Sequence, residues 1–110
     1  MSFRHKNLAD GAWYKLTLTE QLANIGSEIG RTISWRKKGR ENYSKAAFFR
    51  GLELLDMTIA GQKENSKLKE LCRARELLCD YFLGENQYKQ NDRMWQKYFY
   101  AYAYLSRINL

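Results

Sequence analysis

Apolar residues recur at intervals of three and four in four stretches of similar length, and this spacing is the strongest constraint on the fold. It places the apolar side chains on one face of a helix, which must then pack against other helices. The chain has 110 residues and no proline, which suits one compact helical domain. We therefore predict an all-α fold, an antiparallel up-down four-helix bundle formed by residues 16–110. Residues 1–15 are predicted to form a flexible N-terminal segment.

Capping residues and glycines predict where the helices begin and end. Thr17 and Glu20 have the spacing of a capping box, in which each side chain satisfies a free backbone N–H at the start of a helix. Gly39, Gly61 and Gly84 each follow an apolar stretch and are typical helix terminators. The four predicted helices are residues 18–38, 42–60, 66–83 and 92–108.

Two glycines lie inside the first predicted helix. Gly26 and Gly30 are four residues apart and share a face adjoining the apolar stripe. Each weakens an isolated helix by up to ~1 kcal/mol unless a neighbour packs closely against it. We therefore predict that another helix crosses the first helix at these positions.

The fourth helix carries more apolar residues than one face of a bundle requires. We assign its core side to five residues at helical spacing: Met94, Tyr98, Ala101, Leu105 and Ile108. Trp95, Phe99 and Tyr102 lie about 100° away around the helix axis. Exposed apolar patches usually mark interfaces, so these three residues are predicted to contact another subunit or a partner protein.

The third helix shows the same excess. Leu77 and Tyr81 lie outside the arc that contains Leu68 and Phe82, and we add both residues to the predicted interface. The alternative is that the N-terminal segment folds back and covers the surplus apolar faces through Phe3, Trp13 and Tyr14.

The end of the first helix carries the densest positive charge in a chain whose formal net charge is +7. Such a surplus favours polyanionic partners. The cluster is predicted to bind nucleic acid through Arg31, Trp35, Arg36, Lys37, Lys38 and Arg40, with the indole offering a stacking surface for a base. An ordinary alternative is that cations at a helix C-terminus offset the helix dipole, for which no ligand is needed.

Arg75 falls in the middle of the apolar arc of the third helix. An unpaired buried ion costs several kcal/mol, so Arg75 needs a carboxylate partner. Glu28 and Asp56, on the flanks of the inward faces of the first two helices, are the candidates. We predict a structural ion pair here in preference to a catalytic role.

Catalytic and metal-binding patterns are missing from the sequence. The chain has one His and two Cys, and it lacks the Glu-x-x-His pairs of di-iron bundles and closely spaced metal ligands. Cys72 and Cys79 lie about 10 Å apart on one helix, beyond disulfide reach. We expect a non-enzymatic cytoplasmic protein with no cofactor, no metal and no membrane contact.

Four segments carry a resemblance to a known family: LTLTEQLANIGSEI at 16–29, LELLD at 52–56, RARELLCDYF at 73–82 and QKYF at 96–99. They resemble small four-helix-bundle proteins of bacteria and archaea. That family includes the accessory variability determinants of diversity-generating retroelements and the proteins encoded in intervening sequences of large-subunit ribosomal RNA genes. The resemblance covers roughly residues 13–109 and contains no catalytic motif.

The resemblance implies a homo-oligomeric ring, a pentamer, with a basic surface. It also implies binding to a reverse transcriptase and its template RNA in support of mutagenic cDNA synthesis. A second functional class stays open, in which the chain is an oligomeric adaptor between proteins with no nucleic-acid role. Salt separates the two classes, because phosphate contacts weaken steeply as salt rises.

Overall fold

The computed structural model describes residues 11–108, and within this range the regular structure is entirely helical. The elements in chain order are η2 (Trp13–Lys15), α1 (Leu18–Lys37), α2 (Glu41–Gly61), α3 (Asn65–Phe82) and α4 (Asp92–Ile108). The predicted start of α1 is confirmed: Thr17 Oγ1 accepts from the backbone N–H of Glu20, and Glu20 Oε1 accepts from that of Thr17. The all-α prediction with four long helices is confirmed for this part of the chain.

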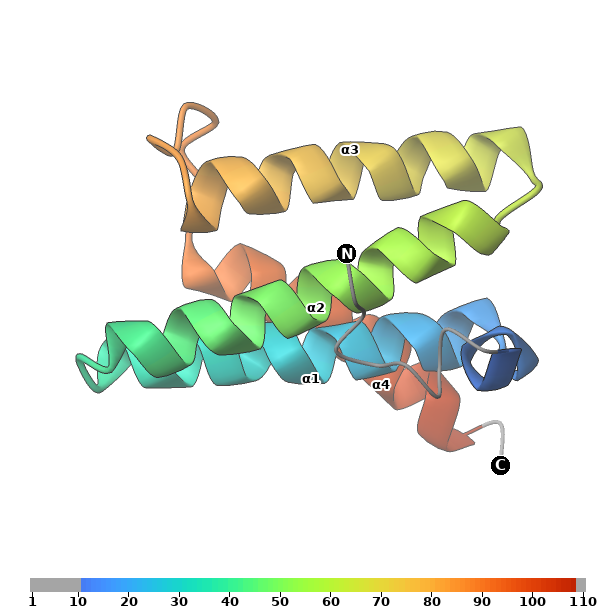
Figure 1. Cartoon of the computed structure of the whole chain (residues 1–110), viewed down its shortest axis with the longest axis horizontal. Coiled ribbons are helices and arrows are strands. Elements are labelled where there is room, and N and C mark those ends of the chain that lie inside the picture. Colours follow the sequence, from blue (N-terminus) through green and yellow to red (C-terminus); the bar gives the residue numbers. More distant parts are fainter. Residues whose placement is uncertain (1–10, 109–110) are drawn as a thin grey trace.

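The helix α1 is the centre of the fold because it packs along both α2 and α4. Figure 1 shows α2 between α1 and α3, so that α3 packs on the side of α2 away from α1. The approach of α3 to α4 is less close. Tyr98 of α4 hydrogen-bonds Glu70 of α3, and Gln90, in the loop just before α4, hydrogen-bonds the Leu77 carbonyl of α3. None of the helices in residues 11–108 combines the length and the apolar character needed to cross a membrane.

The α1–α2 contact is closely packed. Ile25 and Ile29 of α1 are buried, as are Phe48 and Leu55 of α2. A Cβ built on Gly51 of α2 would lie 3.3 Å from Glu28 Cβ and 3.4 Å from Ile29 Cδ1. The missing side chain therefore lets the two helix backbones approach each other closely.

The prediction that a helix crosses α1 at its glycines is confirmed at Gly26. A Cβ there would lie 2.6 Å from Phe99 Cβ on α4, which is shorter than the contact distance of two non-bonded carbon atoms. At Gly30 an added Cβ would meet no atom within 4 Å. Of these two glycines, only Gly26 is in close contact with α4.

The predicted rotation of α4 is wrong. Trp95 and Phe99, predicted to face a partner, are each only 5% exposed and pack in the core. Met94, Leu105 and Ile108, predicted to face the core, are 50%, 41% and 55% exposed. The physical reason is that Gly26 admits the ring of Phe99, and aromatic side chains bury more apolar area than the aliphatic residues they displace.

The helix α3 is also rotated relative to the prediction. Its buried residues are Leu71, Ala74 and Leu78, whereas Cys72 is exposed. Arg75 lies at the edge of this buried arc rather than in its middle, and its side chain is 42% exposed. Because α3 packs mainly against α2, its buried face is narrower than the apolar spacing alone suggests.

The N-terminal prediction needs a further correction at Trp13, which is buried. Trp13 Nε1 donates to Thr58 Oγ1 at 3.0 Å, and the Trp13 carbonyl accepts from Gln21 Nε2 at 3.0 Å. Within the described residues, the segment thus packs on α1 and α2 through Trp13 rather than on the outer faces of α3 and α4. Tyr14 is 46% exposed, and Phe3 lies outside the described residues.

Candidate nucleic-acid and partner interfaces

A short turn joins α1 to α2 and presents the C-terminal cations of α1. Gly39 has a left-handed φ of 74°, which glycine adopts without steric cost. The backbone N–H of Arg40 donates to the carbonyl of Trp35 at 2.9 Å. These contacts fix the turn, and the side chains of Lys37, Lys38 and Arg40 are exposed on it.

Trp35 takes part in packing at the same turn. Its ring centroid lies 4.9 Å from that of Tyr43 on α2, and Lys38 Nζ lies 5.2 Å from its centroid in a cation–π contact. The indole is half-buried. Trp35 therefore joins α1 to α2, and this contact accounts for its position beside the cations.

Arg36 is held within the chain. Its Nη2 lies 2.7 Å from Asp92 Oδ1 at the start of α4 and donates to Tyr81 Oη at 2.9 Å. Tyr81 in turn donates to Asp92 Oδ1 at 2.7 Å, and burial raises the pKa of its phenol. The guanidinium also lies over the Tyr81 and Phe82 rings, with centroids 4.8 and 4.9 Å away. Arg36 thus joins the end of α1 to α3 and α4. Tyr81 of α3 was predicted to lie at an external interface, but its hydroxyl group contacts Arg36 of α1 and Asp92 of α4.

Glu28 is a buried carboxylate on the α1–α2 seam. One of its oxygens contacts Arg31 Nη1, and the other lies 2.5 Å from Arg50 Nε. Two arginines therefore compensate a carboxylate that would be costly to bury alone. The structure corrects the prediction that Glu28 is a partner of Arg75, and it places Arg31 in an internal ion pair.

Arg75 pairs with Asp56, the other predicted partner. Arg75 Nε lies 2.6 Å from Asp56 Oδ1, and this hydrogen bond raises the pKa of the guanidinium. Both side chains are exposed to solvent, at 42% and 48%. Exposed ion pairs contribute about 0–1 kcal/mol, so this pair is a surface contact between α2 and α3.

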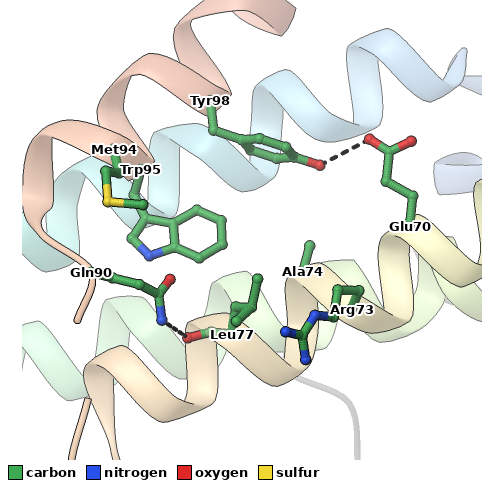
Figure 2. A pocket seen from close by; sticks show the side chains of 8 residues that line it. All are labelled: Glu70, Arg73, Ala74, Leu77, Gln90, Met94, Trp95 and Tyr98. Carbon is green, nitrogen blue, oxygen red and sulfur yellow. Dashed lines mark hydrogen bonds between the residues drawn. The ribbon is translucent and has the colours of Figure 1, made fainter. Parts of the chain in front are cut away.

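A groove of about 280 Å³ opens between α3 and α4 (Figure 2). At one end Tyr98 Oη donates to Glu70 Oε1 at 3.3 Å, and Tyr102 Oη donates to the same oxygen at 3.4 Å. At the other end Gln90 Nε2 donates to the Leu77 carbonyl at 3.0 Å. Burial raises the pKa of the Tyr98 phenol, as it does for Tyr102. The groove is lined by Glu70, Arg73, Ala74, Leu77, Gln90, Met94, Trp95 and Tyr98.

The outward side of α4 keeps large apolar side chains in solvent. These exposed residues are Met94, Tyr100, Tyr104, Leu105 and Ile108, which we call the α4 apolar face. Of the five residues predicted at an interface, Trp95 and Phe99 are core, and Leu77, Tyr81 and Tyr102 are half-buried beside the α3–α4 seam. The exposed apolar residues of α4 are therefore different from the α4 residues that were predicted to form an interface.

The structure also brings together residues that the sequence analysis did not single out. Arg50 meets Glu28 across α1 and α2, and Glu70 and Gln90 close the two ends of the groove. The signal for Gln90 is a long polar loop after α3, where Asn86 adopts a left-handed φ of 55° and accepts from the Gln90 backbone N–H at 2.8 Å. Across residues 11–108, no three His, Cys, Asp or Glu side chains gather closely enough to hold a metal ion.

Comparisons with known proteins give a partial match. The chain is 32% identical over 100 residues to a Staphylococcus aureus protein described as Staphylocoagulase. The aligned part is 87% of this chain and 14% of that protein, so the chain spans about a seventh of its length. No family model matches the chain, and no solved structure matches it.

Proposed function

We propose that this chain is a non-catalytic, basic, homo-oligomeric accessory protein that binds RNA and supports mutagenic cDNA synthesis by a retroelement reverse transcriptase. The observation that carries the RNA-binding part is the α1–α2 turn. Lys37, Lys38 and Arg40 are exposed there, and no carboxylate within residues 11–108 forms an ion pair with them. Cations in this state are available for phosphate contacts, which supply most non-specific nucleic-acid affinity.

Two further features support the proposal. The resemblance to accessory proteins of diversity-generating retroelements implies the reverse transcriptase, its template RNA and a five-fold ring. The α4 apolar face offers a surface that a second subunit would cover. We propose that the helices alternate in an antiparallel up-down order within each subunit, and that α4 lies toward a neighbouring subunit in the ring.

The test of RNA binding is a charge-matched comparison. Replacing Lys37, Lys38 and Arg40 together with Gln should weaken retention of a structured RNA and should reduce the slope of log affinity against log salt. The control replaces Lys63, Lys67 and Lys69 with Gln, because these residues are also exposed and the same charge is removed. The control should retain most of the wild-type affinity. Equal losses in the two triple variants would refute the turn as the binding site.

The α4 apolar face also favours a second candidate, an oligomeric adaptor between proteins. In this function the positive charge serves solubility alone. Partner binding through an apolar face should respond little to salt, whereas phosphate binding should fall steeply between low and moderate salt. RNA retention that is absent even at low salt, together with salt-insensitive oligomers, would favour the adaptor.

A further inference from the structure

The outward side of α4 carries a row of cations and aromatic rings. Arg93, Lys97, Tyr100 and Tyr104 follow one another at intervals of four, three and four residues, so they lie along one side of the helix. All four side chains are exposed, with Tyr100 at 63% and Tyr104 at 52%. The row extends about 16 Å along the helix axis. We call it the α4 tyrosine–cation stripe.

The two cations of the stripe have no partner within residues 11–108. Neither Arg93 nor Lys97 pairs with a carboxylate or lies over an aromatic ring. After Asp92 the helix α4 contains no Asp or Glu. A cation in the first turn of a helix opposes the helix dipole, so Arg93 does not stabilise α4. Both charges are therefore available to an external anion.

The two tyrosines of the stripe are also without partners in this range. Other exposed rings hold a cation or a second ring, as Tyr88 does with Arg73. Neither Tyr100 nor Tyr104 contacts another ring, and neither hydroxyl group forms a hydrogen bond within residues 11–108. Exposed aromatic rings beside cations are typical of surfaces that bind single-stranded nucleic acid, because bases stack on the rings.

The stripe begins close to the basic α1–α2 turn. Asp92, the neighbour of Arg93, pairs with Arg36 at 2.7 Å. Arg36 immediately precedes Lys37 of the turn. A nucleic acid that is bound at the turn can therefore continue along α4.

The stripe and the aliphatic part of the α4 apolar face lie on different sides of the helix. Met94, Leu105 and Ile108 are centred about 80° away around the helix axis. A second subunit that covers these three residues leaves the stripe at the edge of the contact. A subunit interface also does not account for Arg93 and Lys97, because charged residues are depleted in the core of such interfaces.

We propose that the α4 tyrosine–cation stripe binds an unpaired segment of RNA. Arg93 and Lys97 contact phosphate oxygens, and unpaired bases stack on the rings of Tyr100 and Tyr104. Paired bases keep their faces stacked inside a duplex, so the stripe selects single strands. The inference rests on the proposed RNA binding and specifies the form of RNA that the chain prefers.

The test compares two probes that carry the same phosphates. One is a short oligouridylate, and the other is a chain of the same length built from stable abasic ribose units. Fluorescence anisotropy of an end label at low salt measures both affinities for the full chain. The wild type should bind the oligouridylate more tightly. Because the two probes have equal charge, the ratio of their affinities measures base stacking.

Three double variants locate the stacking. Tyr100→Leu with Tyr104→Leu keeps apolar side chains and removes both rings, so the affinity ratio should fall at least about 5-fold. Tyr100→Phe with Tyr104→Phe keeps the rings and should preserve the ratio. The matched control is Tyr14→Leu with Tyr88→Leu, at tyrosines outside α4 that are 46% and 48% exposed. This control should also keep the wild-type ratio.

A fourth double variant tests the cations. Arg93→Gln with Lys97→Gln removes the phosphate contacts, so it should weaken the binding of both probes by similar factors and leave the ratio unchanged. A loss confined to the oligouridylate would contradict the assignment of these two residues to phosphate.

Three further results would overturn the inference. The first is equal affinity of the wild type for the two probes, which would leave the RNA binding proposed for the α1–α2 turn intact. The second is an unchanged ratio in Tyr100→Leu with Tyr104→Leu; a smaller oligomer in that variant would assign both tyrosines to a subunit contact. The third is the absence of binding to either probe at low salt, which would refute the proposed RNA binding as well.

Discussion

The α1–α2 seam and the α3–α4 seam are built from similar residue types but differ in how closely they pack. Gly51 lets α2 approach α1 so that isoleucine, leucine and phenylalanine side chains fill the space between the two helices. Between α3 and α4 the small residue Ala74 lines an open groove and the helices do not approach closely; hydrogen bonds lie at the two ends of this groove. Two seams of similar apolar composition can therefore differ in packing. The seam is filled by side chains where the two helix backbones lie close together, and a groove remains where they do not.

The difference in packing between the two seams also indicates which parts of the chain stabilise the fold and which are available for binding. Close packing of apolar side chains is the main source of folding free energy, and in this chain it lies around α1. The surfaces with unsatisfied or exposed groups are the α3–α4 groove, the α4 apolar face and the α1–α2 turn. We expect substitutions around α1 to alter stability and substitutions on those three surfaces to alter binding.

The largest expected effect comes from one substitution made in both seams. Leu55→Ala in the closed seam should lower the free energy of unfolding by about 2–5 kcal/mol, because it leaves a cavity in a fully buried site. Leu77→Ala at the groove should cost only about 1 kcal/mol, because its side chain is half-buried beside open space. Urea unfolding of the two variants measures both values. Equal losses would show that the seams are packed alike.

A second pair tests where α4 crosses α1. Gly26→Ala should destabilise the chain by about 1–3 kcal/mol, since the new methyl group would overlap Phe99 Cβ and force α4 away. Gly30→Ala meets no neighbour and should stabilise the helix by about 0.5–1 kcal/mol. Thermal unfolding of the two variants should therefore shift in opposite directions. If Gly26→Ala were more stable than the wild type, α4 could not pack against Gly26 as described.

A third pair compares the two arginines that reach across helices. Arg36→Gln removes contacts with Asp92, Tyr81 and Phe82, and we expect a loss of about 1 kcal/mol because the group is partly exposed. Arg75→Gln removes a more exposed surface pair with Asp56 and should cost less than that. Chemical unfolding at low and high salt measures both. A larger loss of stability for Arg75→Gln than for Arg36→Gln would contradict the view that Arg36 makes the more important contact between helices.

At neutral pH the smallest expected effect is that of the Tyr98 phenol at the α3–α4 seam, because its titration changes stability only in alkaline solution. Burial raises the pKa of Tyr98 in the folded chain, while an unfolded tyrosine titrates near pH 10. The folded state therefore holds the phenolic proton more tightly than the unfolded state does. The resulting contribution to the free energy of unfolding is complete below about pH 10. It is lost as the pH rises above this value, by at most ~1.4 kcal/mol per pH unit. Tyr98→Phe should flatten the alkaline loss of stability. Tyr104→Phe, at an exposed position on the same helix, is the control and should keep the wild-type slope.

The sequence predicts the helices well because their signals are local. Apolar spacing, the Thr17–Glu20 capping box and the glycines after each stretch depend on neighbours within a few residues. The rotation of α3 and α4 depends on distant residues, because α4 is apolar around most of its circumference. The close contact of Gly26 with Phe99 is one such distant contact, and it favours the side of α4 that faces inward.

The sites show the same limit. The cationic end of α1 is visible in the sequence, but the partners that hold Arg31 and Arg36 lie on the same helix in one case and on α4 in the other. Asp56 was one of two plausible partners of Arg75, and only the packing of α2 against α3 separates them. The groove could not be predicted at all, because it is the space left where α3 and α4 do not meet closely.

The most direct measurement of the central claim, that α4 keeps an apolar face for another subunit, is the mass of the chain in solution. Sedimentation equilibrium over the micromolar range should give an oligomer for the wild type, and Leu105→Lys with Ile108→Lys should shift it toward single chains without unfolding. A wild-type chain that stays monomeric across this range would contradict the account.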